Sequence, residues 1–251
     1  MSAQRLEPIR LLDEDPDLGE GLEPAEFEQA RRDLVVRMLR VPAGAWDPST
    51  LWDQPNGMGL IVLDGLLLRD VDLGRRSSTE VLGSGDLLRP WDPNPPMDAL
   101  PLKIRWSVLQ DARLAVLDRR FTMSAARWPA ILDEVTCRAM RRSRFLAVRL
   151  VVNQLVRLED RLLLGLWALA ERWGRVTPDG VLVPMELTHS ALARLVGARR
   201  PSVTSALGVL SRDRLVERTE HGWLLRGTPS EVLDPVTERL NSAAGTAAAT
   251  G

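Results

Sequence analysis

The sequence has few of the side chains that redox centres and metal sites require. Cys137 is the only cysteine among 251 residues, so no intramolecular disulfide can form. An iron–sulfur cluster, which takes about four thiolates, is excluded for the same reason. Both histidines, His189 and His221, lie in the C-terminal half, so the N-terminal half lacks imidazole ligands for a haem or a metal-dependent enzyme. We therefore expect neither a cofactor nor a metal.

Long hydrophobic runs are also lacking. The longest, LLLGLWALA at 162–170, has roughly half the length that a bilayer span needs. The acidic N-terminal stretch contains no apolar segment of the kind found in signal peptides. The lone cysteine agrees with a reducing compartment. These features predict a cytoplasmic protein that does not cross a membrane.

Charge is nearly balanced over the whole chain but unevenly distributed along it. The formal net charge of −1 does not by itself indicate a protein that binds nucleic acid. Residues 1–30 hold nine acids against two arginines, whereas residues 181–226 hold seven arginines against four acids. Residues 181–226 are therefore basic while the N-terminal stretch is acidic, and this basic segment carries the most informative motif of the sequence.

The N-terminal part alternates apolar runs with turn signals. PAEFEQARRDLVVRML at 24–39 predicts a helix. Asp64–Gly65 between two apolar runs is a strong signal for a β-hairpin. Further turns at GRRSS and GSGD, with strand-like KIRWSVL and ARLAVLD, predict a small antiparallel barrel or sandwich over about residues 40–118. Its expected core tryptophans are Trp46, Trp52, Trp91 and Trp106. Trp91 is alternatively a candidate to stack on an aromatic ligand.

Residues 130–157 contain neither glycine nor proline and predict one helix about 42 Å long. Its apolar residues recur at heptad-like spacing, interrupted by Arg142 and Arg149. Two interpretations remain open. The helix either packs on the barrel as core, or forms a seam with a second chain, in which Asn153 sets the register and the protein is a homodimer. The heptad positions are Leu132, Val135, Ala139, Leu146, Asn153 and Val156. We expect a solvated face at Arg138, Arg141, Arg142 and Arg144.

The remaining chain predicts mostly short elements. EDRLLLGLWALAERWG at 159–174 predicts a helix, and VLV after a Pro-Asp-Gly turn predicts a strand. Residues 187–218, LTHSALARLVGARRPSVTSALGVLSRDRLVER, predict a helix, a break and a second helix, and a hairpin about His221–Gly222 follows. The small, polar tail predicts disorder. The expected domains are 1–118, 119–158 and 159–228, followed by the disordered tail at 229–251.

The helix–break–helix stretch has the features of a DNA reader. Thr188 is a good N-cap for its first helix, and Gly197 supplies the sharp break. Polar side chains then gather near the N-terminus of the second helix, which suits phosphates, while arginine can fork onto guanine in a major groove. Together with the hairpin, this predicts a winged helix-turn-helix on double-stranded DNA; a plain helical hairpin is the alternative. The candidate DNA-binding residues are Thr188, His189, Arg199, Arg200, Ser202, Thr204 and Ser205.

Residues 159–227 resemble the DNA-binding domain of the Crp/Fnr family of bacterial transcription regulators. The run GLIVLDGLLLRDVDL…TEVLGSGDLL more weakly resembles the central strands of that family's effector-binding β-roll. The resemblance implies an α+β fold with an N-terminal antiparallel, jelly-roll-like β-roll, a long dimerisation helix and a C-terminal winged helix-turn-helix. It also implies a homodimer that regulates transcription on a pseudo-palindromic operator and contacts RNA polymerase.

The resemblance assigns roles to single residues as well. Arg200 matches the family's first base-reading arginine, whereas Pro201 and Ser205 replace the glutamate and the second arginine that follow it. This departure puts the family's usual half-site in doubt. The positions that touch phosphates in the family correspond to Thr188, His189, Arg199 and Ser202.

Comparison with the family's phosphate-binding cassette implies that the effector is not cyclic AMP. After the Gly85–Asp86 turn the family carries Gly-Glu and then an arginine for the cyclic phosphate; here Gly-Glu is missing and Leu102 stands at the arginine's position. A buried phosphate without its charge partner is costly. We therefore expect a regulator that responds to an unidentified small effector. The alternative is an effector-independent regulator whose β-roll serves only dimerisation and partner contact. A third possibility, an enzyme with an accessory winged helix, is not supported, because the sequence shows no set of catalytic residues.

Overall fold

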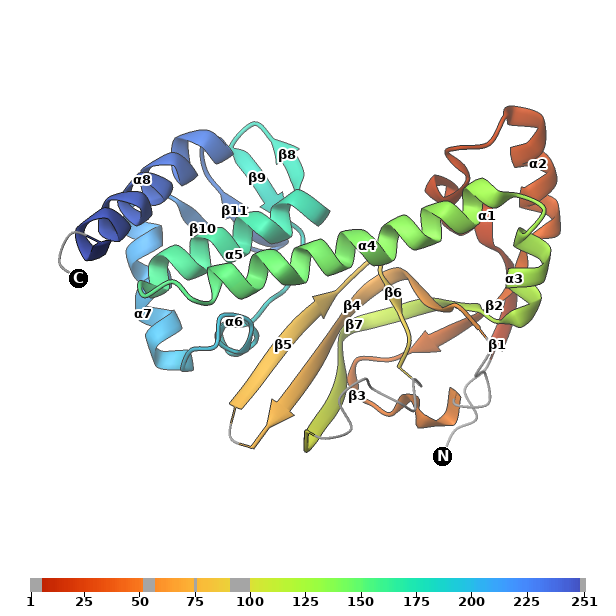
Figure 1. The fold of residues 1–251 in the computed structure, drawn as a ribbon, viewed down its shortest axis with the longest axis horizontal. Helices are drawn as coiled ribbons and strands as arrows, with labels where there is room; N and C mark the ends of the chain where they lie inside the picture. Colours follow the sequence, from red (N-terminus) through yellow and green to blue (C-terminus); the bar gives the residue numbers. More distant parts are fainter. Residues whose placement is uncertain (1–5, 52–56, 75, 91–99, 249–251) are drawn as a thin grey trace. The chain divides into compact units, whose positions relative to one another are not determined.

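The computed structural model describes residues 6–51, 57–74, 76–90 and 100–248. The chain divides into two compact units, Met1–Arg144 and Phe145–Gly251, here called unit 1 and unit 2 (Figure 1). The division falls inside a long helix, and not at 118 or 158 where the sequence predicts domain boundaries. The α+β class is confirmed, with an antiparallel sheet in unit 1 and a helix-turn-helix in unit 2. Trp52 and Trp91 lie outside the described residues.

Unit 1 is built on one antiparallel sheet in the order β1-β2-β7-β4-β5, with β3 paired to β7 and β6 paired to β4 (Figure 1). The two long central strands, β4 and β7, pair along most of their length. The strands are β1 Leu6–Arg10, β2 Val35–Val41, β3 Gly44–Trp46, β4 Gly59–Leu73, β5 Arg76–Leu82, β6 Leu87–Leu88 and β7 Leu102–Leu117.

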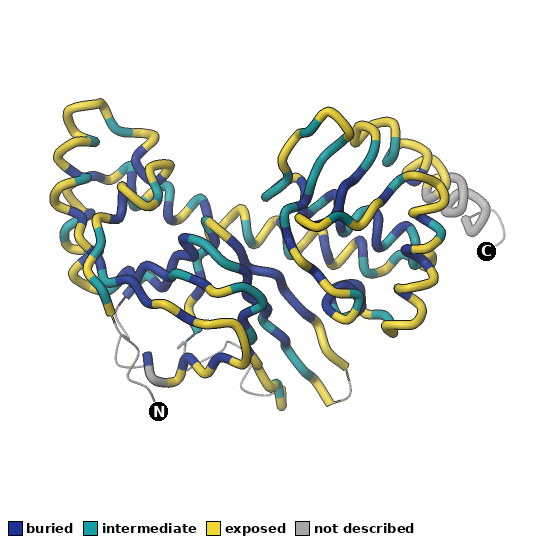
Figure 2. The backbone as a smooth tube through the Cα atoms, turned by 180° about the vertical axis from the view of Figure 1, so that it is seen from behind, coloured by how far each residue is buried: buried dark blue, intermediate teal, exposed yellow. Residues whose placement is uncertain are grey.

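Over its central part this sheet has a hydrophobic core on each face, which explains the apolar run GLIVL at the start of β4. In β4, Ile61 belongs to one core cluster and its neighbour Val62 to the other, because successive side chains of a strand point to opposite faces. The first cluster includes the surrounding helices through Phe121 and Ile131. The second includes Trp46 and Trp106, whose rings meet edge to face with centroids 5.7 Å apart. Figure 2 shows the resulting buried backbone along these strands.

The hairpin expected at Asp64–Gly65 is wrong, because β4 continues straight through it. The pairing of β4 with β7 shifts register around Asp64 and Leu66, so the Asp-Gly pair forms a bulge. Gly65 has φ +96°, and a Cβ there would lie 2.5 Å from the Cα of Ala112 on β7. The glycine is therefore needed for the close approach of two backbones within a strand, not for a chain reversal.

The helix expected over 24–39 is correct only for its first ten residues. α2 (Pro24–Asp33) begins with a capping box between Glu23 and Glu26, and β2 starts at Val35. Val36 and Met38 lie in one core cluster of the sheet and Leu39 and Val41 in the other, and this tertiary burial outweighs helical periodicity. The other helices of unit 1 are α1 Leu11–Glu14, η1 Pro16–Gly19, η2 Pro48–Leu51 and α3 Arg119–Ala125.

α4 (Pro129–Val152) is the expected long helix, but it ends at Val152 and not at Arg157. The amides of Gln154 and Leu155 bond three residues back, to the carbonyls of Val151 and Val152, so the chain tightens into a turn. Val135, one of the heptad positions, is fully buried in the core of unit 1 and cannot belong to a seam with a second chain.

The predicted solvated face of α4 is wrong for two of its four arginines. Arg138 is only 6% exposed, and its guanidinium donates to both oxygens of Asp15 at 2.5 and 2.9 Å. Arg142 donates to both oxygens of Glu80 at 2.7 and 2.9 Å. Arg141 and Arg144 are exposed, as expected.

Unit 2 contains the remaining elements and a four-stranded sheet in the order β10-β11-β9-β8. The predicted helices, strand and hairpin are all present, and β8 adds a strand that the sequence did not indicate. The tail predicted to be disordered is instead α8 through Ala248, because Val236 buries its side chain (2% exposed) and Arg239 donates to Asp160 on α5 at 2.9 Å. The elements are α5 Leu158–Trp173, β8 Arg175–Thr177, β9 Gly180–Val183, α6 His189–Leu195, α7 Arg200–Arg212, β10 Val216–Thr219, β11 Gly222–Leu225 and α8 Pro229–Ala248. Among the helices of the described residues, none has the length and apolarity needed to cross a bilayer.

Candidate nucleic-acid interface

The first helix of the motif begins as the sequence indicates. The Oγ1 of Thr188 accepts a hydrogen bond from the amide of Ala191 at 3.1 Å, so Thr188 is the N-cap of α6. The buried face of α6 consists of Ala191, Leu192, Ala193 and Leu195. Thr188 is exposed, and its hydrogen bond with the Ala191 amide holds its side chain against the start of α6 at the surface of unit 2.

The turn between the two helices is a Schellman motif. The amide of Ala198 bonds the carbonyl of Ala193 at 2.9 Å, and Gly197 adopts φ +64° between them. This left-handed conformation favours glycine, so Gly197 is the reason that the chain turns within a few residues. The turn ends at Arg199, the N-cap of α7.

α7 separates an apolar face from a polar one, as the sequence predicts. Val203, Ala206, Leu207 and Leu210 are buried and hold the helix in unit 2. Arg199, Arg200, Ser202, Thr204 and Ser205 are exposed. Within the described part of the chain, neither the Arg199 nor the Arg200 guanidinium has a hydrogen-bond or acidic partner. Two free cations therefore lie at the start of α7, where the helix dipole adds partial positive charge.

Two of the candidate hydroxyls are already engaged within the protein. The Oγ1 of Thr204 lies 2.9 Å from the Nδ1 of His189 and donates to the carbonyl of Arg200 at 3.1 Å. Ser205 Oγ donates to the carbonyl of Pro201 at 3.2 Å. The His189–Thr204 contact joins the first residue of α6 to α7, which brings these two predicted site residues together. Ser202, in the first turn of α7, is the candidate hydroxyl of this helix that makes no such hydrogen bond among the described residues.

The structure adds two residues that the sequence reasoning missed. The carbonyl of Leu187, just before the N-cap of α6, accepts from Trp223 Nε1 at 3.0 Å and from Arg218 Nη1 at 2.9 Å. The Arg218 guanidinium also lies 5.0 Å from the Trp223 ring centroid. The hairpin of β10 and β11 is thus fastened to the start of α6. No local pattern pairs residues 31 and 36 positions apart, so sequence spacing could not reveal this contact.

Comparison with known proteins matches the same segment. Residues 152–226 match the Crp-like helix-turn-helix domain. The global nitrogen regulator of Synechococcus elongatus is 32% identical over 76 residues, which cover 30% of this chain and 34% of that protein. The match therefore spans about a third of the relative's length.

Solved structures resemble a larger part of the fold. A protein of Listeria monocytogenes that contains a cyclic nucleotide-binding domain covers 84% of this chain and 96% of its own, at 14% identity and a TM-score of 0.59. A transcriptional regulator of the CRP family from Thermus thermophilus covers 75% and 91% respectively, at 19% identity and a TM-score of 0.51. At these identities the likeness concerns the fold alone.

Proposed function

Because residues 152–226 of this chain match the Crp-like helix-turn-helix domain, we propose that the protein is a sequence-specific, DNA-binding transcriptional regulator of the Crp/Fnr type. The observation that carries the proposal is the pair of exposed guanidiniums at the start of α7, Arg199 and Arg200, neither of which has a partner in the described residues. Free arginines beside a helix N-terminus suit both phosphates and the guanine edge. Since chromosomal DNA is the proposed partner, we propose that the protein acts in the cytoplasm. RNA polymerase is proposed as a further partner.

Arg200 is proposed as the main base reader, and Arg199 as a phosphate ligand together with Thr188, His189 and Ser202. Arg200→Ala is expected to cost about 1–3 kcal/mol in operator binding and to relax the preference at one base pair in each half-site. Arg199→Ala serves as the matched control, because loss of a phosphate contact weakens all sequences alike. Base-preference profiles from selection on random duplexes test this. Identical profiles for the wild type and Arg200→Ala would contradict the assignment.

The proposed regulator is a homodimer through α4. The residues that support this differ from the predicted heptad positions: on the part of α4 that belongs to unit 2, Val148 is 50% exposed and Val151 64%. These residues recur at helical spacing, so they share one face of α4. A two-fold dimer is expected to bind a pseudo-palindromic operator.

The sheet of unit 1 is proposed to respond to a small effector other than cyclic AMP. Leu102 begins β7 opposite Leu73 and brings no charge to a phosphate. Calorimetry with millimolar cyclic AMP is expected to show no saturable heat. Micromolar binding together with a rise in DNA affinity would contradict this.

A second candidate, an effector-independent regulator, is favoured by a cluster in which two partly buried arginines, Arg69 and Arg142, flank the buried Glu80. Glu80, 4% exposed, accepts from Arg69 at 2.8 Å and from Arg142 at 2.7 and 2.9 Å. Burial opposes the charge of Arg142, but hydrogen bonds to Glu80 and its charge raise the pKa above its ordinary value. The cluster holds α4 to β5 with side chains of the protein alone. Specific operator binding by protein purified without added ligand favours this candidate, whereas binding gained with a ligand favours the first.

A further inference from the structure

A buried arginine near the end of α4 contacts the helix-turn-helix. Arg149 is 7% exposed, and its Nη2 donates to the carbonyl of Leu195 at 2.9 Å. Leu195 is the last residue of α6, two positions before Gly197. Arg149 and Leu195 both belong to unit 2. An arginine that interrupts an apolar helix pattern is therefore used to bind the turn before α7.

A second arginine does the same from α5. The Nη1 of Arg161 donates to the carbonyl of Val196, the C-cap of α6, at 3.1 Å. The last four carbonyls of a helix have no partner within the helix, and cations are favoured beside them. Two guanidiniums from two different helices thus satisfy consecutive carbonyls at the end of α6.

We propose that Arg149 and Arg161 are positioning residues for DNA recognition. They fix the turn at Val196–Arg199 and thereby set the direction in which α7 presents Arg200. The inference rests on the proposed DNA-binding function. It assigns a role to two side chains that are turned into unit 2 and do not themselves touch DNA. Without their hydrogen bonds α7 remains helical but samples several directions, so base reading is lost while attraction to phosphates is kept.

The experiment compares two DNA probes for each variant. One is the operator duplex selected by the wild-type protein, and the other is a scrambled duplex of equal length. Arg149→Met and Arg161→Met remove the hydrogen bonds but keep a long side chain, and each is expected to lower operator affinity about tenfold while leaving affinity for the scrambled duplex unchanged. Arg149→Lys, which can still donate to the Leu195 carbonyl, is expected to restore most of the loss. Arg175→Met on β8 removes one exposed guanidinium of unit 2 and is the matched control for charge.

A second measurement follows the turn directly. The amides of Val196 and Ala198 bond the carbonyls of Leu192 and Ala193 at 3.0 and 2.9 Å. Their hydrogen exchange is expected to accelerate about tenfold or more in Arg149→Met, but not in Arg175→Met, because exchange reports local opening. This result does not depend on DNA, so it holds even for a variant that binds poorly.

The outcomes separate the two proposals. An equal loss of affinity for both duplexes, or unchanged exchange at the turn, would overturn the positioning role while leaving DNA binding in place. Failure of the wild type itself to prefer any duplex would overturn the proposed function, and the positioning role with it.

Discussion

The single residues whose surroundings differ most from the sequence-based prediction are arginines of α4 that are shielded from solvent. The sequence places Arg138 and Arg142 on a helix rich in arginine, where a solvated face is the ordinary arrangement. Their acidic partners, Asp15 and Glu80, lie 123 and 62 positions away in the chain. Only the tertiary fold brings these pairs together, so no local pattern predicts them. The motif residues Thr188 and Gly197, in contrast, act on their immediate neighbours and were predicted correctly as cap and break.

Arg214 is the one non-glycine residue with positive φ in the described part of the chain, at +56°. It follows the C-cap of α7, where the amide of Leu215 bonds the carbonyl of Leu210 at 2.9 Å, and this position usually carries glycine. Arg214→Gly is expected to raise the free energy of unfolding by up to about 1 kcal/mol, because it relieves the left-handed strain. Urea denaturation measures the gain. Arg214→Ala removes the same side chain without relieving the strain, so an equal gain from alanine would show that strain is not the cause.

The elements of the chain could be predicted where their signals are local, and could not where a neighbouring strand decides. The order helix, strand, helix, helix, hairpin in unit 2 follows from caps, glycines and apolar spacing. Asp64–Gly65 carries an equally strong local signal, yet pairing with β7 converts it into a bulge. Likewise β2 begins where a helix was expected, since its side chains fill both cores of the sheet. These outcomes depend on contacts between distant segments.

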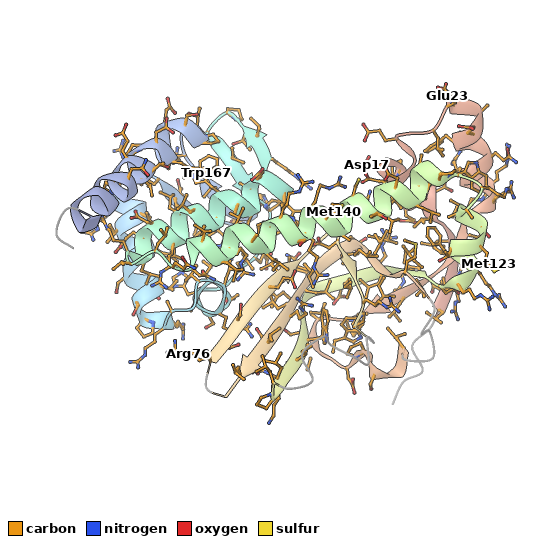
Figure 3. All side chains as sticks on the ribbon, in the orientation of Figure 1. Asp17, Glu23, Arg76, Met123, Met140 and Trp167 are labelled. Atoms are coloured by element: carbon orange, nitrogen blue, oxygen red, sulfur yellow. The ribbon has the colours of Figure 1, made fainter. Side chains whose placement is uncertain are left out.

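The proposed dimer depends on the exposed apolar face of α4. Val151→Glu places a charge among apolar side chains and is expected to weaken self-association about 30-fold or more, as loss of a central interface residue does. Analytical ultracentrifugation over a concentration series measures this. Met123→Glu is the control, because Met123, labelled in Figure 3, is 66% exposed on α3, a helix of unit 1. A Val151→Glu protein that sediments as the wild type does, with unchanged circular dichroism, would refute the α4 seam.

At the scale of the whole molecule, the sequence predicted two kinds of architecture in the right order. The sheet region and the helix-turn-helix are both present. They could be predicted because short apolar strands separated by turns and a capped pair of helices have clearly different sequence patterns. The position of the division at Arg144 was not predicted, since α4 is continuous through it. Six of the seven candidate DNA-binding residues are exposed, and His189 is half-buried. The arginines proposed to hold α7 in place were not recognised, because their acceptors are backbone carbonyls that leave no mark in the sequence.

We propose that two copies of this chain, related by two-fold symmetry, read DNA together. The most direct measurement is genomic footprinting with purified full-length protein, followed by affinity for a recovered site as a function of salt. We expect protected sites with two inverted half-sites about one helical turn apart. We also expect an affinity that falls by about a thousandfold or more between 50 and 200 mM salt, as several phosphate contacts require. Sites protecting a single half-site, or an affinity that does not change with salt, would contradict the claim.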